Sequence, residues 1–393
     1  MSTPHHRTRV HIVTASLVAA TVVAAGVISP VFAQQPPPSW KQGQPDSLKD
    51  STLAPVPQPP APLAAEKIPV NKIKVPPGFK VELWASGISN ARAMTLGKKG
   101  TLFVSSRVVG DVYAVVDQGG KRTVKTIAKG LDIPNGVAYR DGSLYVAAQN
   151  RILRYDGIED KLDNPGEPVV VIDSLPKHQP HGWKYLAFGP DGKLYFNIGA
   201  PGNIVMPPET NANISRINAD GSGFEYVARG VRNSVGFDWH PVTKELYFTN
   251  HGRDWLGEDV PNDTLHQVSG RNVPHFGYPY CHQGDILDPD FGRGHACSEF
   301  NPPLLKLGPH VAPIGMIFYT GSMFPPEYKN RIFIAQRGSW NRTEKLGYGV
   351  TTVSLAMGRP PVQEGFASGW LENNKPWGRP AYLYQMPDGA LLV

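Results

Sequence analysis

Residues 187–199, AFGPDGKLYFNIG, decide the fold, because a Pro-Asp-Gly turn leads there into an apolar run that predicts a β-strand. Asp-Gly supplies the positive φ angles that a tight hairpin turn requires. The same polar turn and alternating apolar strand recur along the chain. The copies are residues 95–107, 138–150, 187–199 and 238–250, with weaker ones at 318–338 and 384–393. The chain is therefore predicted to consist of similar units made of short strands.

The spacing of the copies indicates a β-propeller. Successive copies carry an equivalent apolar residue after 42, 50, 52, 86 and 59 residues. These positions are Leu102, Leu144, Leu194, Leu246, Ile332 and Leu391. Units of about 40 to 50 residues are typical of this fold, whereas a β-sandwich or barrel does not require six similar units. We therefore predict an all-β, six-bladed β-propeller over residues 72–393, with an insertion between Leu246 and Ile332.

The two ends of this propeller carry separate expectations. The last copy ends at Val393, inside the strand that follows its turn, so the sixth blade is expected to be truncated at the C-terminus. Residues 73–84, IKVPPGFKVELW, are expected to supply an outer strand that helps to close the ring.

Composition excludes several other classes of protein. The 393 residues include 41 Gly and 39 Pro, which argues against helical bundles, coiled coils and doubly wound α/β enzymes, because their helices need long runs free of both. The formal net charge is +6, but the basic residues are scattered, with no Lys/Arg block beyond pairs such as Lys98 and Lys99. We therefore expect no nucleic-acid partner.

The first 71 residues are expected to lie outside the propeller. Residues 1–33 combine a cationic start, an apolar stretch and the small-residue end Val31-Phe32-Ala33, as in an export signal peptide. An uncleaved membrane anchor is the alternative, because the apolar stretch is nearly long enough to span a bilayer. Residues 34–71 are Pro-rich without periodicity and predict a disordered linker. The expected location is periplasmic or secreted, with membrane association only through an uncleaved N-terminal segment.

The two cysteines, Cys281 and Cys297, predict a disulfide. They lie 16 positions apart in a segment rich in Gly, Pro and Asp. In an oxidising compartment such a pair most simply closes a short loop. A metal site would need more Cys or His at regular spacing, and a catalytic thiol would not need the second Cys.

Polar clusters beside the repeat strands are the candidate site residues, because a propeller gathers its loops around one mouth of a central channel. They are residues 178–184, 229–233, 250–254, 337–342 and 377–379. Each has an ordinary alternative as a capped loop or a turn, but they recur at matching positions in successive units. One neutral His among several Arg suits proton abstraction beside a bound anion.

At these residues the sequence resembles the soluble pyrroloquinoline quinone (PQQ)-dependent sugar dehydrogenases, which include glucose dehydrogenase-like enzymes. It is most similar to their sorbosone dehydrogenase branch, and the resemblance spans residues 73–393. The segments that carry it are HGWKYLAFGPDGKLY (181–195), ARGVRNSVGFDWHP (228–241), NHGRDWLGEDVPND (250–263), LGPHVAPIGMIFYTG (307–321) and GRP (378–380).

The resemblance implies a six-bladed propeller with PQQ over the channel mouth and two catalytic residues. His181 corresponds to the family's base, which takes a proton from the sugar while hydride moves to the quinone. Arg232 would stabilise negative charge that grows on the quinone oxygen. The acidic residue that precedes the base in the soluble glucose dehydrogenases is Pro180 here, so a different group must orient His181.

The resemblance also implies sites for the cofactor and for Ca²⁺. The cofactor-binding residues correspond to Arg232, Asn233, Arg337 and Arg379. Arg337 is preferred to Gln336 because it keeps the charge of the family's lysine, whereas a second arginine near the end is replaced by Ala381. Ca²⁺ would bind the backbone carbonyls of Gly252 and Arg253 and polarise the quinone, although the family has Pro in place of Arg253.

The predicted function is PQQ-dependent oxidation of an aldose or a sugar aldehyde such as sorbosone, with electrons passed to a separate acceptor, a quinone or a cytochrome. No dinucleotide fingerprint and no CxxCH haem motif is present. One alternative is a metal-dependent sugar lactonase, although Arg92 lies where a lactonase needs an acid in the first blade. A non-catalytic binding propeller is the other. The acidic residues Asp254, Glu258, Asp259 and Asp263 are interpreted as a solvated loop rather than as a further Ca²⁺ site.

Overall fold

The computed structural model describes residues 38–55, 62–178, 180–270, 272–356 and 358–393. The expected signal peptide, residues 1–33, and residues 34–37 and 56–61 of the expected linker lie outside the described residues. The described ranges contain β-strands and short 3-10 helices, and no α-helix. None of the helices in these ranges is long and apolar enough to cross a membrane.

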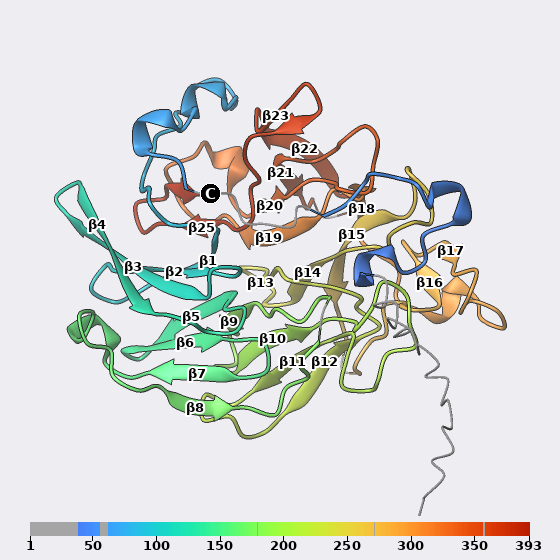
Figure 1. Cartoon of the computed structure of the whole chain (residues 1–393), viewed down its shortest axis with the longest axis horizontal. Helices are drawn as coiled ribbons and strands as arrows, with labels where there is room; N and C mark the ends of the chain where they lie inside the picture. The colour runs from blue at the N-terminus through green and yellow to red at the C-terminus, as the bar shows by residue number, and fades with distance from the viewer. Residues whose placement is uncertain (1–37, 56–61, 179, 271, 357) are drawn as a thin grey trace, which may run out of the picture. The chain divides into compact units, whose positions relative to one another are not determined.

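Five four-stranded antiparallel sheets follow one another around a common centre, and the first strand of each sheet lies nearest that centre (Figure 1). Blade 1 contains β1 (Ala91–Leu96), β2 (Leu102–Ser106), β3 (Asp111–Gln118) and β4 (Lys121–Ala128). Blade 2 contains β5 (Gly136–Arg140), β6 (Ser143–Ala147), β7 (Ile152–Tyr155) and β8 (Val169–Ile172). Blade 3 contains β9 (Leu186–Phe188), β10 (Leu194–Ile198), β11 (Asn213–Ile217) and β12 (Glu225–Arg229). Blade 4 contains β13 (Phe237–Trp239), β14 (Leu246–Asn250), β15 (Asn262–Val268) and β18 (Leu305–Pro309). Blade 5 contains β19 (Pro313–Phe318), β20 (Ile332–Gln336), β21 (Gly349–Ser354) and β22 (Val362–Ala367).

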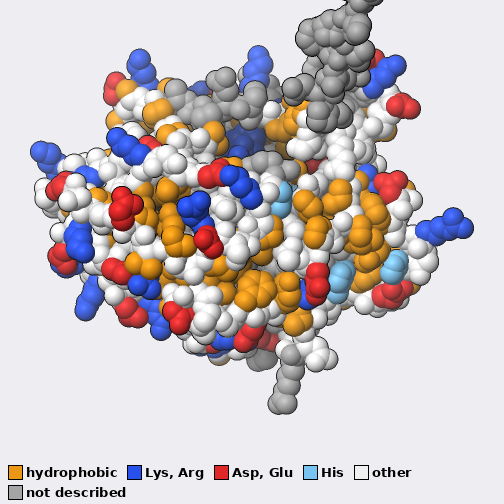
Figure 2. Space-filling view, turned by 60° about the horizontal axis from the view of Figure 1, so that its bottom comes forward, with side chains coloured by type: hydrophobic (Ala, Val, Ile, Leu, Met, Phe, Trp, Pro, Cys, Tyr) orange, Lys and Arg blue, Asp and Glu red, His pale blue; other side chains and the backbone are white. Residues whose placement is uncertain are grey.

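Charged side chains on the surface are mixed in sign. Figure 2 shows Lys and Arg interspersed with Asp and Glu over the face in view, with small apolar areas between them. Many of these charges form exposed pairs, such as Lys125 with Asp163 at 2.7 Å. The face shown carries no concentrated cationic stripe.

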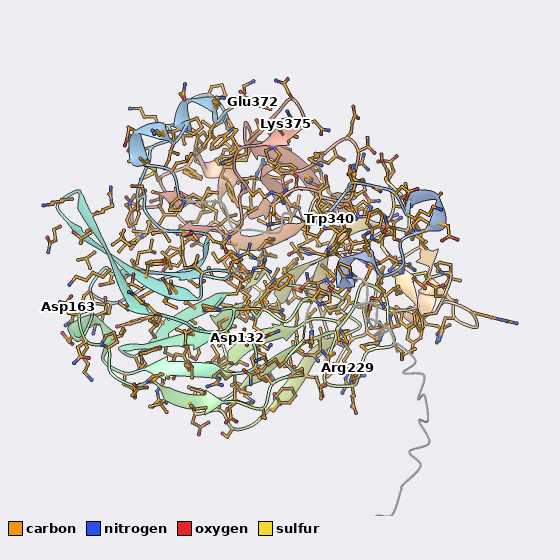
Figure 3. The ribbon with its side chains drawn as sticks, viewed as in Figure 1. Asp132, Asp163, Arg229, Trp340, Glu372 and Lys375 are labelled. Carbon is orange, nitrogen blue, oxygen red and sulfur yellow. A yellow bond between two sulfur atoms is a disulfide. The ribbon has the colours of Figure 1, made fainter. Side chains whose placement is uncertain are left out.

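The repeat that predicted the units builds the inner half of every blade. Each copy spans the first and second strands of a sheet, and five of its apolar positions are almost fully buried. These are Leu102, Leu144, Leu194, Leu246 and Ile332. Gly192, in the turn between β9 and β10, has φ +77°, as the Asp-Gly pattern requires. Side chains fill the space between the ribbons (Figure 3), and each buried aliphatic residue stabilises the fold by about 2 kcal/mol.

The predicted number of blades is wrong: five four-stranded blades are present, and the sixth copy forms only a hairpin. Its strands are β25 (Tyr384–Gln385) and β26 (Leu391–Leu392). The copy contains a single turn, which can join only two strands. The hairpin packs between blades 5 and 1, since Tyr319 Oη donates to the Gly389 carbonyl at 2.8 Å and Leu392 packs with Leu102.

Residues 73–84 do not form the expected outer strand. Their pairing is limited to an isolated bridge between Lys74 and Ser368, because Pro76 and Pro77 have no N–H to donate. The segment nevertheless covers the same gap. Ile73 and Phe79 pack on blade 5, and Trp84 lies under Arg122 of blade 1, with the guanidinium 4.4 Å from the ring centroid.

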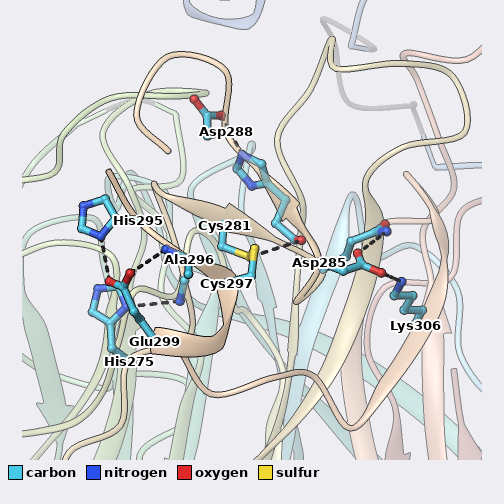
Figure 4. The surroundings of a disulfide bond; sticks show 12 residues. His275, Cys281, Asp285, Asp288, His295, Ala296, Cys297, Glu299 and Lys306 are labelled. Atoms are coloured by element: carbon cyan, nitrogen blue, oxygen red, sulfur yellow. Dashed lines mark hydrogen bonds and ion pairs between the residues drawn. A yellow bond between two sulfur atoms is a disulfide. The ribbon is translucent and has the colours of Figure 1, made fainter. Parts of the chain in front are cut away.

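The insertion expected between Leu246 and Ile332 lies between β15 and β18. It contains β16 (Cys281–His282), β17 (Ile286–Leu287) and the 3-10 helix η6 (Cys297–Glu299). The predicted disulfide between Cys281 and Cys297 is confirmed, with Cα atoms 5.5 Å apart (Figure 4). Inside this loop the Asp288 carboxylate accepts a hydrogen bond from His282 Nε2 at 2.7 Å, so the insertion has a polar core of its own.

Part of the expected linker has regular structure. Residues 38–55 contain η1 (Ser39–Lys41) and η2 (Asp46–Leu48), and residues 62–72 contain η3 (Ala65–Lys67) and η4 (Val70–Lys72). Gln42 contacts the loop between β10 and β11 of blade 3, and Trp40 contacts the loop between β14 and β15 of blade 4. At these two residues the structure differs from the expected disordered linker.

Candidate functional site

His181 lies in the loop between β8 and β9 and is 8% exposed. Its backbone φ is +63°, a strained value for a residue with a side chain. Nδ1 donates a hydrogen bond to the Ala200 carbonyl at 2.9 Å, which leaves the lone pair of Nε2 free. Burial, reinforced by the positive charge of Arg232, holds the pKa of His181 well below its usual value. The side chain is therefore a neutral base whose accepting atom is Nε2.

The backbone of residues 199 and 200 joins His181 to Arg232. The Ala200 N–H donates to the Arg232 carbonyl at 2.8 Å, and the Ala200 carbonyl accepts from His181. Gly199 makes this close approach possible, because a Cβ at that position would lie 2.5 Å from the Cβ of His181. The structure thus brings together the two residues that the sequence selects as catalytic. The Ala200 carbonyl orients His181, which Pro180 cannot do because it has no acidic side chain.

The loop that carries His181 is held from within the fold. Lys184 is 1% exposed, and its Nζ donates to the carbonyls of Gln149 and Gly182. Burial lowers the pKa of Lys184 to about 7. His178 donates from Nδ1 to the Pro180 carbonyl at 2.8 Å. These contacts frame the turn around residue 181 from both sides.

Arg232 is buried and anchored by two residues that sequence reasoning did not connect with it. Its Nε donates to the Asn203 backbone carbonyl at 2.8 Å, and Nη2 donates to Asn203 Oδ1 at 2.8 Å and to Asp254 Oδ2 at 3.0 Å. Nη1 has only a 3.4 Å contact with the His251 carbonyl, so it remains the nitrogen that is freest to bind a ligand. Asn203 lies in an irregular segment after β10, and no sequence signal marks it.

Asn233 and His251 form a second buried pair beside Arg232. Asn233 Nδ2 donates to His251 Nδ1 at 3.0 Å, and His251 Nε2 donates to the Pro313 carbonyl at 3.0 Å. Burial lowers the pKa of His251 to about 3, so the ring is neutral and both of its nitrogens are used. Within the described ranges, the buried Oδ1 of Asn233 has no hydrogen-bond partner.

Four arginines from the first blade, the fifth blade and the chain before the last hairpin form what we call the arginine cluster. Its members are Arg92, Arg107, Arg337 and Arg379. No acidic partner lies within ion-pair distance of any of them in the described part of the chain. Instead Arg107 stacks on Trp183, 4.2 Å from the ring centroid, and Arg379 lies over Tyr348, at 5.2 Å. Because Trp183 also contacts the ring of His181, the arginine cluster extends to the candidate base.

Burial and mutual repulsion lower the pKa values in the arginine cluster. The pKa of Arg107 is lowered to about 9 by burial and by the charge of Arg92. The pKa of Arg337 is lowered well below its usual value by burial and by the charges of Arg379, Arg92 and Arg107. The charges of arginines this close together repel one another and destabilise the fold unless a bound anion neutralises them.

Unused donors point to the same conclusion. Several buried N–H groups here have no acceptor in the described ranges. They are Nε of Arg107, Nη1 of Arg379, Nε2 of Gln336 and Nε1 of Trp183. A buried donor without an acceptor costs about 1–3 kcal/mol. The donor set therefore fits a planar group rich in carboxylate and carbonyl oxygens. The sequence selected Arg337 and Arg379 but did not name Arg92 or Arg107 as ligands, because each follows or interrupts an ordinary strand pattern.

The carbonyls of Gly252 and Arg253, expected to bind Ca²⁺, accept no hydrogen bond in the described part of the chain. The Gly252 N–H donates to the buried Asp263 carboxylate at 2.8 Å, and the Arg253 guanidinium turns away to Asp288 at 2.6 Å. Both carbonyl oxygens are thus available, and oxygen is the ligand that Ca²⁺ prefers. In the described ranges no group of three or more His, Cys, Asp or Glu side chains offers an alternative metal site.

The acidic residues after Gly252 do not form a common site. Asp254 pairs with Arg232, and Asp259 pairs with Arg342 at 2.8 Å. Glu258 accepts the Thr343 N–H at 2.7 Å. Asp263 accepts backbone N–H groups, and burial raises its pKa to about 6. Each carboxylate therefore has its own partner, although Asp254 belongs to the candidate site rather than to a solvated loop.

The family of this chain follows from a match to a family sequence model. The sequence model of the TrAA12-like family matches residues 73–290 and 290–368. The chain belongs to the TrAA12-like family. This confirms the resemblance that was expected from the motifs around His181, Arg232 and Gly252.

Two sequence relatives and two solved structures are similar to this TrAA12-like chain. An uncharacterized protein of Borreliella burgdorferi is 34% identical over 345 residues, which cover 84% of this chain and 89% of that protein. The pyrroloquinoline quinone-dependent pyranose dehydrogenase of Coprinopsis cinerea is 23% identical over 335 residues, which cover 72% of this chain and 45% of that protein. The holo structure of a Coprinopsis cinerea pyranose dehydrogenase PQQ domain has a TM-score of 0.69 at 18% identity, covering 81% of this chain and 93% of that one. A calcium structure of a Trichoderma reesei AA12 enzyme has a TM-score of 0.68 at 18% identity, covering 87% and 96%.

One part of the predicted clusters lies away from the site in this TrAA12-like fold. Arg229 ends β12 at the periphery (Figure 3), where it pairs with the exposed Glu209 at 3.0 Å. Its neighbours Arg232 and Asn233 point inward because the chain turns at Gly230, which has φ +65°. A run of adjacent polar residues is therefore divided between the surface and the site.

Proposed function

We propose that this protein is a PQQ-dependent oxidoreductase that acts on sugars. The observation that carries the proposal is the arginine cluster, which has no acidic partner among the described residues and reaches the neutral His181 through Trp183. PQQ, when bound, supplies a quinone that accepts a hydride, and its carboxylates match arginine side chains. The Coprinopsis cinerea relatives, which carry PQQ in their names, support the same assignment.

In this proposal each residue has a defined part. His181 Nε2 accepts the proton of the sugar hydroxyl at the carbon that is oxidised, and its Nδ1 stays bonded to Ala200. Arg232 presents Nη1 to negative charge that develops in the transition state. Asn233, Arg337 and Arg379 hold the cofactor.

Ca²⁺ would be held by the free carbonyls of Gly252 and Arg253. The support is the donor chemistry of two consecutive carbonyls that accept no hydrogen bond from the residues the structure describes, together with the calcium structure of the Trichoderma reesei relative. The ion would act as a Lewis acid beside the cofactor.

The proposal also names a substrate class, an electron acceptor and a cellular location. We propose an aldose or a sugar aldehyde such as sorbosone as substrate, on the strength of the segments that resemble the sorbosone dehydrogenase branch. We propose that electrons pass to a separate acceptor, a quinone or a cytochrome, since this sequence contains no CxxCH haem motif. The disulfide between Cys281 and Cys297 supports an oxidising compartment, periplasmic or secreted.

The lactonase alternative has less support. A lactonase needs carboxylates around an ion, whereas Arg92 lies in the first blade with its Nε bonded to Asn135 Oδ1 at 3.0 Å. The described acidic side chains near the site are each engaged by a separate partner.

The test is reconstitution of protein lacking residues 1–33 with PQQ, with and without Ca²⁺, followed by dye-reduction assays on aldoses and sugar aldehydes. We expect cofactor binding that requires Ca²⁺ and dye reduction with at least one sugar. Folded protein that binds no PQQ would refute the proposal and favour a non-catalytic propeller. Lactone hydrolysis without PQQ would favour the lactonase.

A further inference from the structure

An N-terminal segment that precedes the propeller contacts the residue that anchors Arg232. Gln42 Oε1 accepts the Asn203 backbone N–H at 2.7 Å, and the Gln42 carbonyl accepts Asn203 Nδ2 at 2.8 Å. Gln42 Nε2 in turn donates to the Ile204 carbonyl at 3.0 Å. The two partners lie 161 residues apart in the sequence, so these bonds hold the segment around Gln42 against the loop after β10.

Asn203 uses all of its polar atoms to link this segment to the site. It is 1% exposed. Its N–H and part of its side-chain amide bind Gln42, whereas its carbonyl and Oδ1 accept from Arg232 at 2.8 Å each. Oδ1 also accepts the Asp254 N–H at 2.7 Å, and Nδ2 donates to the Asp254 carbonyl at 3.1 Å. A shift of the Asn203 peptide would therefore move Arg232 and Asp254 together.

Three tryptophans fix the other end of the segment. The Trp40 carbonyl accepts Trp255 Nε1 at 2.7 Å. The rings of Trp40 and Trp340 pack edge to face with centroids 6.0 Å apart, and those of Trp255 and Trp340 at 5.4 Å. Trp255 directly follows Asp254, and Trp340 directly precedes Asn341, whose Nδ2 donates to the second oxygen of the Asp254 carboxylate at 2.9 Å. Residues 40–42 therefore contact both sides of the Arg232 and Asp254 pair.

We propose that residues 40–42 are part of the active site, with Gln42 as a positioning residue that holds Arg232 through Asn203. This inference rests on the proposed function, because the group that Arg232 serves is the cofactor. The free Nη1 of Arg232 can meet a developing charge only if Nε and Nη2 are held by Asn203. Preorganisation of this kind depends on the residues behind the one that touches the ligand. The segment N-terminal to the propeller thus contributes to function as well as to spacing.

Two variants in the same segment test the role of Gln42. Gln42→Ala removes the side-chain bonds to Asn203 and Ile204. Gln44→Ala is the matched control, because Gln44 donates only to the nearby Leu48 carbonyl at 2.6 Å. Gln42→Glu keeps an acceptor for the Asn203 N–H and serves as the conservative variant.

The first readout uses protein without cofactor. We expect hydrogen exchange of the peptides that contain Asn203 and Asp254 to speed up in Gln42→Ala, and to stay at the wild-type rate in Gln44→Ala, because the lost bonds hold that backbone. Equal exchange in Gln42→Ala and wild type would refute the positioning role, whether or not PQQ binds.

The second readout is PQQ affinity, measured by titrating protein in the presence of Ca²⁺. We expect Gln42→Ala to weaken binding by about tenfold, the size of a lost buried hydrogen bond, and Gln42→Glu to recover most of it. Gln44→Ala should bind like wild type. Wild-type protein that binds no PQQ refutes the proposed function alone, since the exchange result still decides the contact. Wild-type affinity in Gln42→Ala with faster exchange would show that the segment is structural only, and would overturn the inference.

Discussion

The guanidinium of Arg232 and the carboxylate of Asp254 form a largely buried ion pair, with Nη2 and Oδ2 3.0 Å apart and side chains 3% and 19% exposed. Asp254 is the acid that lies within ion-pair distance of Arg232 in the described ranges, whereas the arginine cluster has none. Among the arginines at the site, Arg232 is therefore neutralised and held in place, whereas the four members of the arginine cluster have no acidic partner in the described ranges. We therefore assign Arg232 to the catalytic step and the arginine cluster to binding of an anionic ligand.

Asp254→Ala should destabilise the protein, because it leaves the Arg232 charge buried without a partner. We expect the free energy of unfolding to fall by about 3–5 kcal/mol in chemical denaturation. Asp163→Ala is the matched surface control, since Asp163 is 86% exposed in its pair with Lys125 and should change the free energy by less than about 0.5 kcal/mol. A loss in Asp254→Ala no larger than that of the control would mean that the pair contributes nothing.

His181→Ala should abolish turnover and leave the cofactor in place. The variant removes Nε2, the accepting atom, but none of the donors in the arginine cluster, so we expect dye reduction to fall at least about 100-fold. PQQ affinity should stay close to that of wild type in a titration. His295→Ala, which removes a surface partner of Glu299 in the disulfide loop (Figure 4), should keep full activity. Retained activity in His181→Ala would exclude this residue as the base.

Arg337→Leu should stabilise the protein without cofactor while it weakens cofactor binding. The Arg337 charge is buried and repelled by Arg379, Arg92 and Arg107, so its removal should raise the free energy of unfolding by about 1 kcal/mol. The same change removes a partner for a carboxylate and should lower PQQ affinity about 10- to 100-fold. Thermal denaturation and titration measure the two effects.

The control for both the gain in stability and the loss of PQQ affinity is Arg229→Ala, which removes a peripheral arginine paired with the exposed Glu209. Neither quantity should change measurably there. If Arg337→Leu lowered stability and left PQQ affinity unchanged, the arginine cluster would be a structural feature.

His266→Phe should change how stability depends on pH. His266 is buried and stacks on Phe248, and burial lowers its pKa to about 3. An unfolded chain has a His pKa of about 6.5, so protonation favours the unfolded state. This contribution to stability is present above pH 6.5 and is lost as the pH falls toward 3, by about 1.4 kcal/mol per pH unit.

The phenylalanine variant cannot take up this proton. Denaturation at several pH values should therefore show the wild type losing stability relative to His266→Phe below pH 6.5, with a constant difference above it. The bond from Thr264 to His266 is lost at every pH and shifts only the constant part. A difference that does not vary with pH would mean that burial does not lower the pKa of His266 in the folded protein.

The repeats show how far local pattern predicts this fold. Leu102, Leu144 and Leu194 are buried as predicted, because a turn and the alternation after it act within a few residues. The blade count was wrong because a sequence copy marks one hairpin and does not reveal how many strands follow it. The hairpin at residues 384–392 is not part of a four-stranded blade, and its position is set by packing between Tyr319 and Leu102.

The sequence alone predicts the succession of blades, the disulfide, and the placement of His181, Arg232 and Asn233 at equivalent ends of strands. Those features follow from spacing, since every blade presents its loops in the same direction. The packing of the blades, by contrast, brings Asn203 and Asp254 to Arg232, places Arg92 and Arg107 beside Arg337 and Arg379, and lets Gln42 contact Asn203. Each of these contacts joins irregular segments that lie far apart in the chain. Their hydrogen bonds and burial depend on how the blades pack, and this packing produces no periodic pattern in the sequence.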